Sequence, residues 1–568
     1  MTVQSTSGDG RGHPGSSKKK TRVVPRGRQV QSGSREELDE LLGSEPPRRD
    51  MLIEYLHVIH DHHGYLSAAH LAALAERMKL AQAEVYEVAT FYAHFNIVKE
   101  DQPPPPAITL RVCDSPSCEM AGASSLASQL ETRLGGQVRV VRAPCMGRCD
   151  TAPVVAVNQR HIDHASLEQV TDAVERGQLV PQIPSYIGLD SYREQGGYQL
   201  LGQCLAETRS PEEIIQSLKH ASLRGLGGAG FPTGTKWEVV RSYPGPRYVA
   251  VNADEGEPGT FKDRFHLERD PHRMLEGALI AAWVVQADTL YIYLRDEYPA
   301  IRKILLTEIE ALQEAGLSSH VKVELRRGAG AYICGEESAM LESIEGKRAL
   351  PRHRPPYVAE RGLFGCPTLV NNVETLHWVR DIVERGPEWF AGHGRNGAKG
   401  LRSYSVSGRV KSPGVKLAPA GITARQLIDE YCDGMLPGHQ FRAYLPGGAS
   451  GGILPESKAD LPLDFGSLAA EDCFVGSHAV VIISDQDDLR GLALNLMRFF
   501  EDESCGQCTP CRVGTQKAVA LMQEKQWNRP LLEELAVVMA DASICGLGQA
   551  APNPLLCTLR YFPEEFES

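Results

Sequence analysis

The chain has 568 residues, a length that predicts three or four domains, each large enough to bury its own core. Its 42% hydrophobic and 23% charged residues are typical of a soluble globular protein, and a net charge of −12 argues against nucleic acid as a partner. The longest apolar stretch, residues 274–294, is interrupted by two acidic residues and a glutamine, so we expect a helix and a buried strand there and no membrane contact.

The N-terminus is basic and rich in glycine and serine. Residues 1–34 carry seven basic residues against Asp9, a charge of +6, which leaves −18 for the rest of the chain. We predict a disordered basic tail over residues 1–35. No apolar stretch follows these charges, so we expect no secretory signal and a cytoplasmic protein. In such a reducing compartment, clustered cysteines bind metal more often than they form disulfides.

Residues 36–102 place apolar side chains at helical spacing and predict a helical segment that ends at a run of four prolines, residues 103–106. Residues 103–185 predict a small α/β domain. Its strands are expected at 107–112, 138–141 and 154–157, and its helices at 124–134 and 166–174.

Two cysteine pairs lie on loops that follow strands of this domain, Cys113-x4-Cys118 and Cys145-x3-Cys149. One pair of thiolates for each iron suits a 2Fe-2S cluster. Zinc is the alternative, although a zinc site more commonly uses two cysteines separated by two residues.

Residues 200–395 alternate between strands, at 248–252, 289–294 and 321–325, and helices, at 211–223 and 299–315. This alternation predicts a doubly wound α/β domain. Its glycine-rich segment, residues 224–234, has the spacing of a dinucleotide fingerprint, but it follows a helix instead of a strand. Its amides could still contact a phosphate or a flat ring, with Lys236 nearby for charge. A glycine-rich surface loop is the alternative, for which Phe231 and Trp237 are unusually apolar.

Three further loops of this domain carry polar side chains. Residues 252–259 follow a predicted strand and contain three carboxylates, although a solvated acidic turn would have the same composition. Residues 328–337 also follow a strand and open a helix, and residues 371–375 have the amide and hydroxyl groups of a helix start. Ligands of open α/β sheets bind beyond the carboxyl ends of the strands, so the three loops together predict a ligand site.

Residues 400–475 have short alternating stretches and many glycines, which predict a small β-rich module. Residues 485–568 return to helical spacing, with helices expected at 489–500, 515–522 and 531–539. Among these helices stands Cys505-x-x-Cys508-x-x-Cys511, followed by Cys545. A triple with a distant fourth cysteine is typical of a 4Fe-4S cluster, whereas zinc, the main alternative, usually takes two cysteine couples. Two such sets in one chain predict electron transfer.

The six remaining cysteines have no partner at ligand spacing and are expected to be buried thiols: Cys204, Cys334, Cys366, Cys432, Cys473 and Cys557. His62, His63 and His94 lack metal-ligand neighbours in the sequence, and we expect them to be structural.

Five segments resemble the flavin subunit of respiratory complex I and its soluble relatives: residues 224–237 (RGLGGAGFPTGTKW), 252–263 (NADEGEPGTFKD), 330–348 (GAYICGEESAMLESIEGKR), 367–375 (PTLVNNVET) and 504–512 (SCGQCTPCR). Residues 87–92 (EVATFY) with the first cysteine set resemble the thioredoxin-like two-iron subunit of that complex. The fusion of both parts, with residues 401–421 (LRSYSVSGRVKSPGVKLAPAG), most resembles the beta subunit of soluble, metal-dependent, NAD-linked formate dehydrogenases.

The resemblance implies a thioredoxin-like 2Fe-2S domain at 103–185, an FMN- and NAD-binding domain at 200–395, a β-grasp (soluble-ligand-binding) module at 400–475 and a helical 4Fe-4S domain at 485–568. The implied cluster ligands are Cys113, Cys118, Cys145 and Cys149 for two irons, and Cys505, Cys508, Cys511 and Cys545 for four. The implied FMN-binding residues are Gly227, Gly228, Gly230, Lys236, Asn252, Asp254, Glu255, Tyr332, Gly335, Glu336, Val370, Asn371, Asn372 and Thr375.

By the same resemblance, Phe231, Glu257 and Glu337 are expected at the reacting centre, in contact with NAD(H). Two departures concern the same region. Arg354-Pro-Pro-Tyr357 replaces a Lys-Pro-Pro-Phe stretch near the dinucleotide, and arginine differs from lysine in hydrogen-bonding geometry. Leu226 stands where many relatives carry a basic residue, which leaves less positive charge for a phosphate.

Hydride transfer to a flavin needs no protein acid or base. The resemblance implies a partner, a large molybdopterin subunit with molybdenum or tungsten and further Fe–S clusters, that oxidises formate while this chain produces NADH. Nothing in the sequence resembles a formate site. The alternatives are the diaphorase of an NAD-reducing hydrogenase, a fused complex I subunit, and a zinc-loaded assembly scaffold without redox activity.

Overall fold

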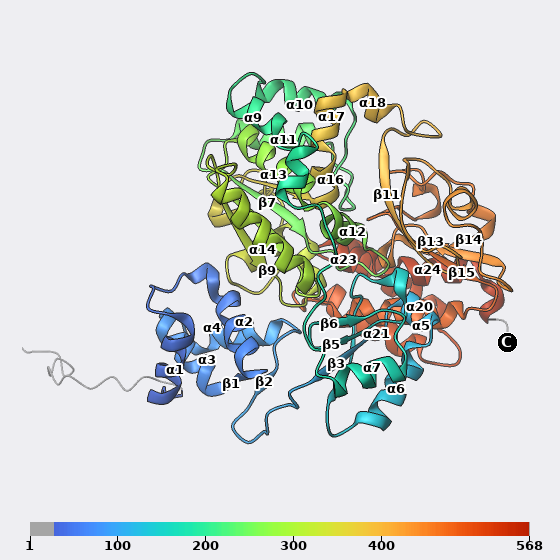
Figure 1. The fold of residues 1–568 in the computed structure, drawn as a ribbon. Helices are drawn as coiled ribbons and strands as arrows, with labels where there is room; N and C mark the ends of the chain where they lie inside the picture. Colours follow the sequence, from blue (N-terminus) through green and yellow to red (C-terminus); the bar gives the residue numbers. More distant parts are fainter. Residues whose placement is uncertain (1–27, 567–568) are drawn as a thin grey trace, which may run out of the picture.

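The computed structural model describes residues 28–566. Figure 1 shows that the domains formed by these residues lie next to one another. The N-terminal helices lie beside the central α/β domain, and the C-terminal helices lie between the two-iron domain and the β-rich module. Most of the predicted basic tail falls outside the described residues. Its predicted end at residue 35 is wrong, because helix α1 (Ser32–Leu42) already begins at Ser32.

The helical segment is confirmed. It comprises α1, a 3-10 turn η1 (Arg49–Met51), α2 (Leu52–His63), α3 (Ala68–Met78) and α4 (Gln82–Phe91). Two short parallel strands, β1 (Leu66–Ser67) and β2 (Ile97–Val98), were not predicted, because two residues are too few to show alternation. Helix α2 buries Leu52, Ile53 and Leu56, and it packs against strand β9 (Lys322–Arg327) of the central domain.

Arg326 of β9 connects this helical segment to the central domain. Its buried guanidinium lies 2.6 Å from Asp50 and 3.5 Å from Glu54. Arg326→Ala is expected to destabilise this docking by about 3 kcal/mol, because it leaves the partly buried Glu54 without its cation and leaves Asp50 with only the more exposed Arg48. Hydrogen exchange in α2 measures the effect. Arg35→Ala, which removes the exposed Arg35–Glu76 pair, should cost only about 0–1 kcal/mol, and equal effects of both variants would contradict the prediction.

The two-iron domain contains β3 (Thr109–Cys113), α5 (Pro116–Met120), α6 (Ala123–Leu134), β4 (Arg139–Ala143), η2 (Cys149–Thr151), β5 (Val155–Val157), β6 (Arg160–Ile162) and α7 (Leu167–Glu175). The sheet order is β4-β3-β5-β6, and only β3 and β4 are parallel. The predicted strands and helices are confirmed, whereas the short α5 and β6 were missed. Because β3 and β4 are parallel, the cysteine pairs that follow them meet at one edge of the sheet.

The central domain has a four-stranded parallel sheet in the order β10-β7-β8-β9. Its strands are β7 (Tyr248–Ala253), β8 (Thr289–Leu294), β9 (Lys322–Arg327) and β10 (Thr368–Asn372). Its helices and turns are α8 (Leu189–Glu194), α9 (Gln199–Leu205), α10 (Pro211–His220), α11 (Thr233–Ser242), α12 (Lys262–Arg269), α13 (Pro271–Val285), α14 (Pro299–Glu314), η3 (Tyr332–Gly335), α15 (Glu337–Ile344), η4 (Leu363–Gly365), α16 (Val373–His377), α17 (Val379–Arg385) and α18 (Pro387–Ala391).

Alternate residues of these strands enter two different cores. Val251 and Ile292 pack with α10, α11 and α13, whereas Ala250 and Tyr291 pack with α15 and the N-terminal helices. Both faces of the sheet are therefore covered, which confirms the doubly wound prediction. The stretch 274–294 is the expected helix, α13, followed by the fully buried strand β8.

The β-rich module contains β11 (Leu401–Gly408), β12 (Gly414–Pro419), α19 (Ala424–Gln426), η5 (Leu427–Tyr431), β13 (Phe441–Leu445), η6 (Ala449–Gly451), β14 (Leu454–Pro455), η7 (Glu456–Lys458), η8 (Ala469–Glu471) and β15 (Ala479–Ser484). The order β12-β11-β15-β13-β14, with β11 parallel to β15, confirms the β-grasp prediction. The predicted end of the module at residue 475 is wrong, because the buried strand β15 lies at the centre of its sheet.

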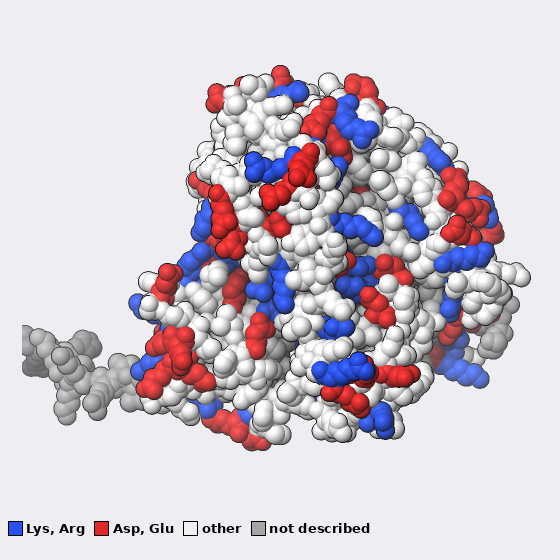
Figure 2. All heavy atoms as spheres, viewed as in Figure 1, with Lys and Arg blue, Asp and Glu red and all other residues white. Residues whose placement is uncertain are grey.

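The C-terminal helices are α20 (Leu489–Asp502), α21 (Thr509–Met522), α22 (Arg529–Ala542), α23 (Gly546–Ala550) and α24 (Asn553–Tyr561), followed by η9 (Pro563–Phe566). The three helices predicted here are confirmed. No helix in residues 28–566 is both long and apolar enough to cross a membrane. On the face shown in Figure 2, acidic and basic side chains are interspersed, and basic residues do not gather into one patch.

Candidate redox site

The glycine-rich loop between α10 and α11 packs against two other parts of the chain. Its Leu226 amide donates to Oγ1 of Thr375 at 2.9 Å, which joins the loop to α16. A Cβ on Gly227 would lie 3.1 Å from Asn372, and one on Gly230 would lie 2.6 Å from the Phe465 ring of the β-grasp module. Gly228 and Gly230 also have φ of +125° and +66°. Only glycines therefore allow this close approach.

The loop after β7 carries a carboxylate with an unused oxygen. Asn252 holds the loop in place by donating from Nδ2 to the Gly335 carbonyl at 2.9 Å. Oδ2 of Asp254 is buried without a hydrogen-bond partner, and burial raises the pKa of this carboxyl well above its ordinary value. A buried unpaired oxygen is costly, and a ligand hydroxyl would satisfy it. Asp254 and the glycine loop therefore fit the ribityl chain and phosphate of a flavin.

Glu255 has a different role from the one expected. Its carboxylate accepts from the amides of Asp263 at 2.8 Å and Arg264 at 3.0 Å, at the start of α12. The Tyr298 hydroxyl also donates to it at 2.8 Å. Burial raises the pKa of Glu255 to about 7. The side chain therefore caps a helix and positions the loop, and a direct flavin contact from its carboxylate is not what the structure presents.

Glu257 lies where two domains meet. Its Oε1 accepts from the amide and the hydroxyl of Ser450, both at 2.7 Å, and its Oε2 accepts from the Tyr332 hydroxyl. Burial raises the pKa of this carboxyl. Sequence reasoning missed Ser450, which is 193 residues away in the β-grasp module. The glycines that flank it, Gly447, Gly448, Gly451 and Gly452, were the signal that could have drawn attention to this loop.

A cluster of opposite charges connects three of the predicted segments. Nζ of Lys236 lies 3.2 Å from the Val370 carbonyl and 3.4 Å from Oε2 of Glu337, and Arg354 lies 3.3 Å from Glu337. Glu336 caps α15 by accepting from the Ala339 amide at 2.9 Å. The structure thus brings these predicted residues together, with Lys236 and Arg354 as cations for a phosphate.

The remaining predicted residues are two exposed aromatic rings and two asparagines at the end of β10. Phe231 and Tyr357 are 49% and 59% exposed, so both rings are free to stack on a ligand. Oδ1 of Asn371 accepts from Nε1 of Trp237 at 2.8 Å. Asn372 donates to Asp263 at 2.6 Å. These amides therefore hold the end of β10 in place.

The four cysteines predicted to bind a 4Fe-4S cluster line one cavity together with Ile333 and Pro351 of the central domain. Burial raises the pKa of Cys511 to about 11 and that of Cys545 to about 12. Four thiols that converge on one cavity are the donor set that a metal ion or an iron–sulfur cluster takes, and a bound cation would stabilise them as thiolates.

The four cysteines predicted to bind a 2Fe-2S cluster are also brought together and are all buried. Sγ of Cys145 lies 3.3 Å from Sγ of Cys149, and both pack against Phe261 of the central domain. Arg295 donates to the Cys145 carbonyl at 2.6 Å and also to the Glu255 carbonyl. This cysteine set therefore adjoins the loop after β7.

Of the other cysteines, five are buried as expected, whereas Cys366 is partly exposed. Cys473 and Cys557 are neighbours in space, because their Sγ atoms lie 3.5 Å apart where the β-grasp module meets α24. Nδ1 of His94 lies 2.6 Å from Oδ2 of Asp296. The expectation that His94 has no metal-ligand neighbours was wrong, because one ligand atom each from His57, Asp61 and His94 lies within 4.8 Å of the others.

Three family models match the chain in the same order as its domains. A thioredoxin-like 2Fe-2S ferredoxin model matches residues 38–178, an FMN-binding domain model matches 218–381, and an iron–sulfur-binding region of NADH-ubiquinone oxidoreductase F matches 491–568. The F 2 subunit of NADH-quinone oxidoreductase from Rhizobium meliloti is 44% identical over 66% of this chain and 93% of its own length. The chain belongs to the family of NADH-quinone oxidoreductase F subunits.

This family also extends to hydrogenases. The HndC subunit of the NADP-reducing hydrogenase of Solidesulfovibrio fructosivorans is 36% identical over 67% of this chain and 80% of its own length. Among solved structures, a chain of an H2-reduced NAD+-reducing NiFe-hydrogenase is 30% identical, with a TM-score of 0.79 over 92% of both chains. As a member of this family, the chain is an NAD(H) oxidoreductase of the diaphorase type that uses FMN, a 2Fe-2S cluster and a 4Fe-4S cluster.

Proposed function

We propose that this member of the family is the diaphorase component of an NAD-linked formate dehydrogenase, and that it receives electrons from a formate-oxidising partner and delivers them to NAD+. The observation that carries the diaphorase role is that the loops of the flavin site touch both cysteine sets. Tyr332 donates its hydroxyl to Glu257 and its amide to Glu503, two residues before Cys505. Arg295 bridges Glu255 and Cys145. The proposed flavin-binding loops therefore lie next to the chain segments that carry the two cysteine sets.

The side chains of the proposed site would position FMN and NAD(H) and provide charge for the phosphate. When bound, FMN would exchange hydride with the nicotinamide and single electrons with the clusters. Asp254 would bind a ribityl hydroxyl, and Lys236 would attract the phosphate. The exposed ring of Phe231 would stack on the nicotinamide, while Glu257, fixed by Tyr332 and Ser450, would orient the ribose or carboxamide.

Glu257→Gln is expected to raise KM for NADH roughly tenfold or more, because a hydrogen bond to a charged group contributes about 1.5–3 kcal/mol. The measurement is steady-state NADH oxidation with an artificial flavin acceptor. Ser450→Ala is the matched variant. It removes a hydroxyl but keeps the Ser450 amide that also donates to Glu257, so a smaller increase is expected. Unchanged KM in Glu257→Gln would remove this residue from the proposed site.

The formate-oxidising partner is supported by the fusion of the two-iron and flavin parts and by residues 401–421, which resemble the formate dehydrogenase beta chain. We propose a large molybdopterin partner with molybdenum or tungsten, in the cytoplasm. A second candidate is the diaphorase of an NAD-reducing hydrogenase, which the likeness to the NiFe-hydrogenase chain over 92% of both chains favours.

Purification of the intact complex under anaerobic conditions distinguishes the two candidates. A molybdopterin subunit with molybdenum or tungsten, together with formate-dependent NAD+ reduction, is the expected result. A nickel-containing subunit and hydrogen-dependent NAD+ reduction would replace formate with hydrogen and leave the diaphorase role intact.

A further inference from the structure

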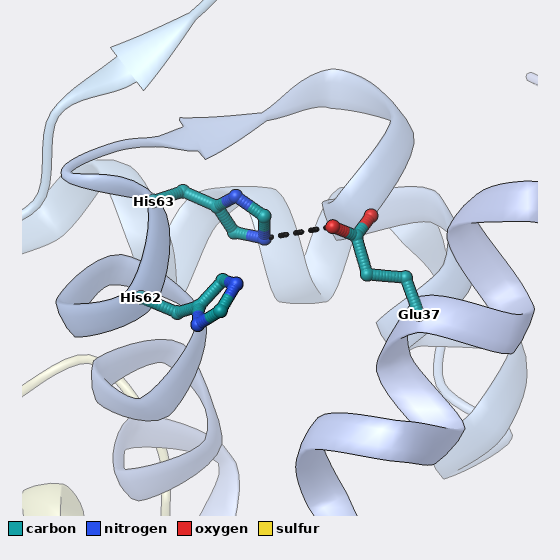
Figure 3. A group of neighbouring side chains, drawn as sticks. All are labelled: Glu37, His62 and His63. Atoms are coloured by element: carbon teal, nitrogen blue, oxygen red, sulfur yellow. Dashed lines mark ion pairs between the residues drawn. The ribbon is translucent and has the colours of Figure 1, made fainter.

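Three helices of the N-terminal segment converge on a group of potential metal ligands, far in sequence from either cysteine set. Glu37 comes from α1, His62 and His63 from the last turn of α2, and His70 from the first turn of α3. One ligand atom each from Glu37, His62 and His63 lies within 4.8 Å of the others. Figure 3 shows the His63 ring and the Glu37 carboxylate facing each other, with the His62 ring beside them. The expectation that His62 and His63 have no other potential metal ligands near them was therefore wrong.

The spacing of these atoms suits a tetrahedral cation. Nε2 of His63 lies 3.3 Å from Oε1 of Glu37, yet this buried nitrogen makes no hydrogen bond. Zinc bonds of about 2.0–2.2 Å to nitrogen and oxygen place tetrahedral ligands roughly 3.3–3.6 Å apart. The His63–Glu37 pair already has this separation. His62 is exposed, so its side chain is free to complete the set.

His70 orients the carboxylate. Its Nε2 lies 3.1 Å from Oε2 of Glu37, within hydrogen-bond distance, which leaves Oε1 directed toward His63. The His70 ring stacks on His63, with centroids 4.4 Å apart. Hydrogen bonds of this kind to a ligating carboxylate fix its direction in metal sites.

The electrostatics also favour a cation. The end of α2 presents the negative pole of the helix dipole, and Glu37 adds a negative charge.

We propose that Glu37, His62 and His63 bind a divalent ion of the zinc class, with water in the fourth position and His70 as the positioning residue. The ion would join α1 to the end of α2. This site is independent of the proposed redox function.

Zinc binding by the anaerobically purified holoprotein tests the proposal. Equilibrium dialysis followed by elemental analysis is expected to give one tightly bound zinc in addition to the full iron content. Glu37→Gln and His62→Ala should each weaken zinc binding at least tenfold. His220→Ala is the matched control, since His220 is an exposed histidine in the last turn of α10, and it should have no effect.

Hydrogen exchange gives a second measurement that does not depend on redox activity. Zinc is expected to slow exchange in α1 and at the end of α2 in the unaltered protein, and not in His62→Ala. His62 is exposed, so this variant should fold normally. Zinc binding that neither Glu37→Gln nor His62→Ala weakens would be adventitious and would overturn the proposal, as would the absence of bound zinc.

Discussion

Cys508→Ser is expected to block electron transfer to the partner while leaving NADH oxidation by an artificial flavin acceptor largely intact. Cys508 lines the cavity shared with Cys505, Cys511 and Cys545, so its loss removes one of the four proposed cluster ligands. The flavin loops lie in another domain and retain their own hydrogen bonds. Both activities should be measured on the intact complex, together with iron and FMN content, and partner-linked activity should fall at least a hundredfold.

Cys366→Ser is the matched control for this variant. Cys366 is a partly exposed cysteine outside both sets, so its replacement should change neither activity. Unchanged partner-linked activity in Cys508→Ser would show that the four-iron set does not lie between the flavin and the partner. Equal loss of both activities with FMN still bound would contradict the expected separation of the two electron-transfer steps.

Gly230→Ala is expected to weaken FMN binding at least tenfold. A left-handed backbone costs a residue with a side chain about 1–2 kcal/mol, and here the added Cβ would also lie 2.6 Å from the Phe465 ring. The loop would have to move away from the module, and a tenfold loss corresponds to about 1.4 kcal/mol. FMN release on dilution, followed by its fluorescence, measures the effect.

Gly438→Ala separates the contact from the backbone strain. Gly438 has a similar φ of +82°, but no atom lies within 4 Å of the position of its Cβ. This variant should lose some stability and keep its FMN. Equal FMN loss in both variants would show that the close approach of the glycine loop to Phe465 is unimportant for binding.

The elements that could be predicted from the sequence were those whose own side chains determine them. Strand β8 is a fully buried apolar run, and its bounds matched the prediction. Strand β10 was missed because its two asparagines read as a helix start, and Asn372 is indeed the N-cap of α16. The central position of β15 depends on pairing with β11 and β13, which spacing along the chain does not reveal.

The candidate site was likewise predictable only in part. Loops at the ends of parallel strands were predictable, because the topology alone brings them together. The direction of each carboxylate was not predictable. Glu255 turns toward α12, Glu257 toward Ser450, and Glu37 meets His63 across two helices. In each case, a partner from a distant part of the chain determines where the oxygen points.

The contact of Gly230 with Phe465 and that of Glu257 with Ser450 have a practical consequence for anyone who wishes to shorten this protein. A fragment truncated after residue 395 would keep the whole parallel sheet and most of the nucleotide loops. It would nevertheless expose to water the side of the glycine loop that packs against Phe465, and Glu257 would lose both of its Ser450 donors and keep only Tyr332. Miniature versions of this electron carrier therefore have to retain the β-grasp module as a wall of the pocket.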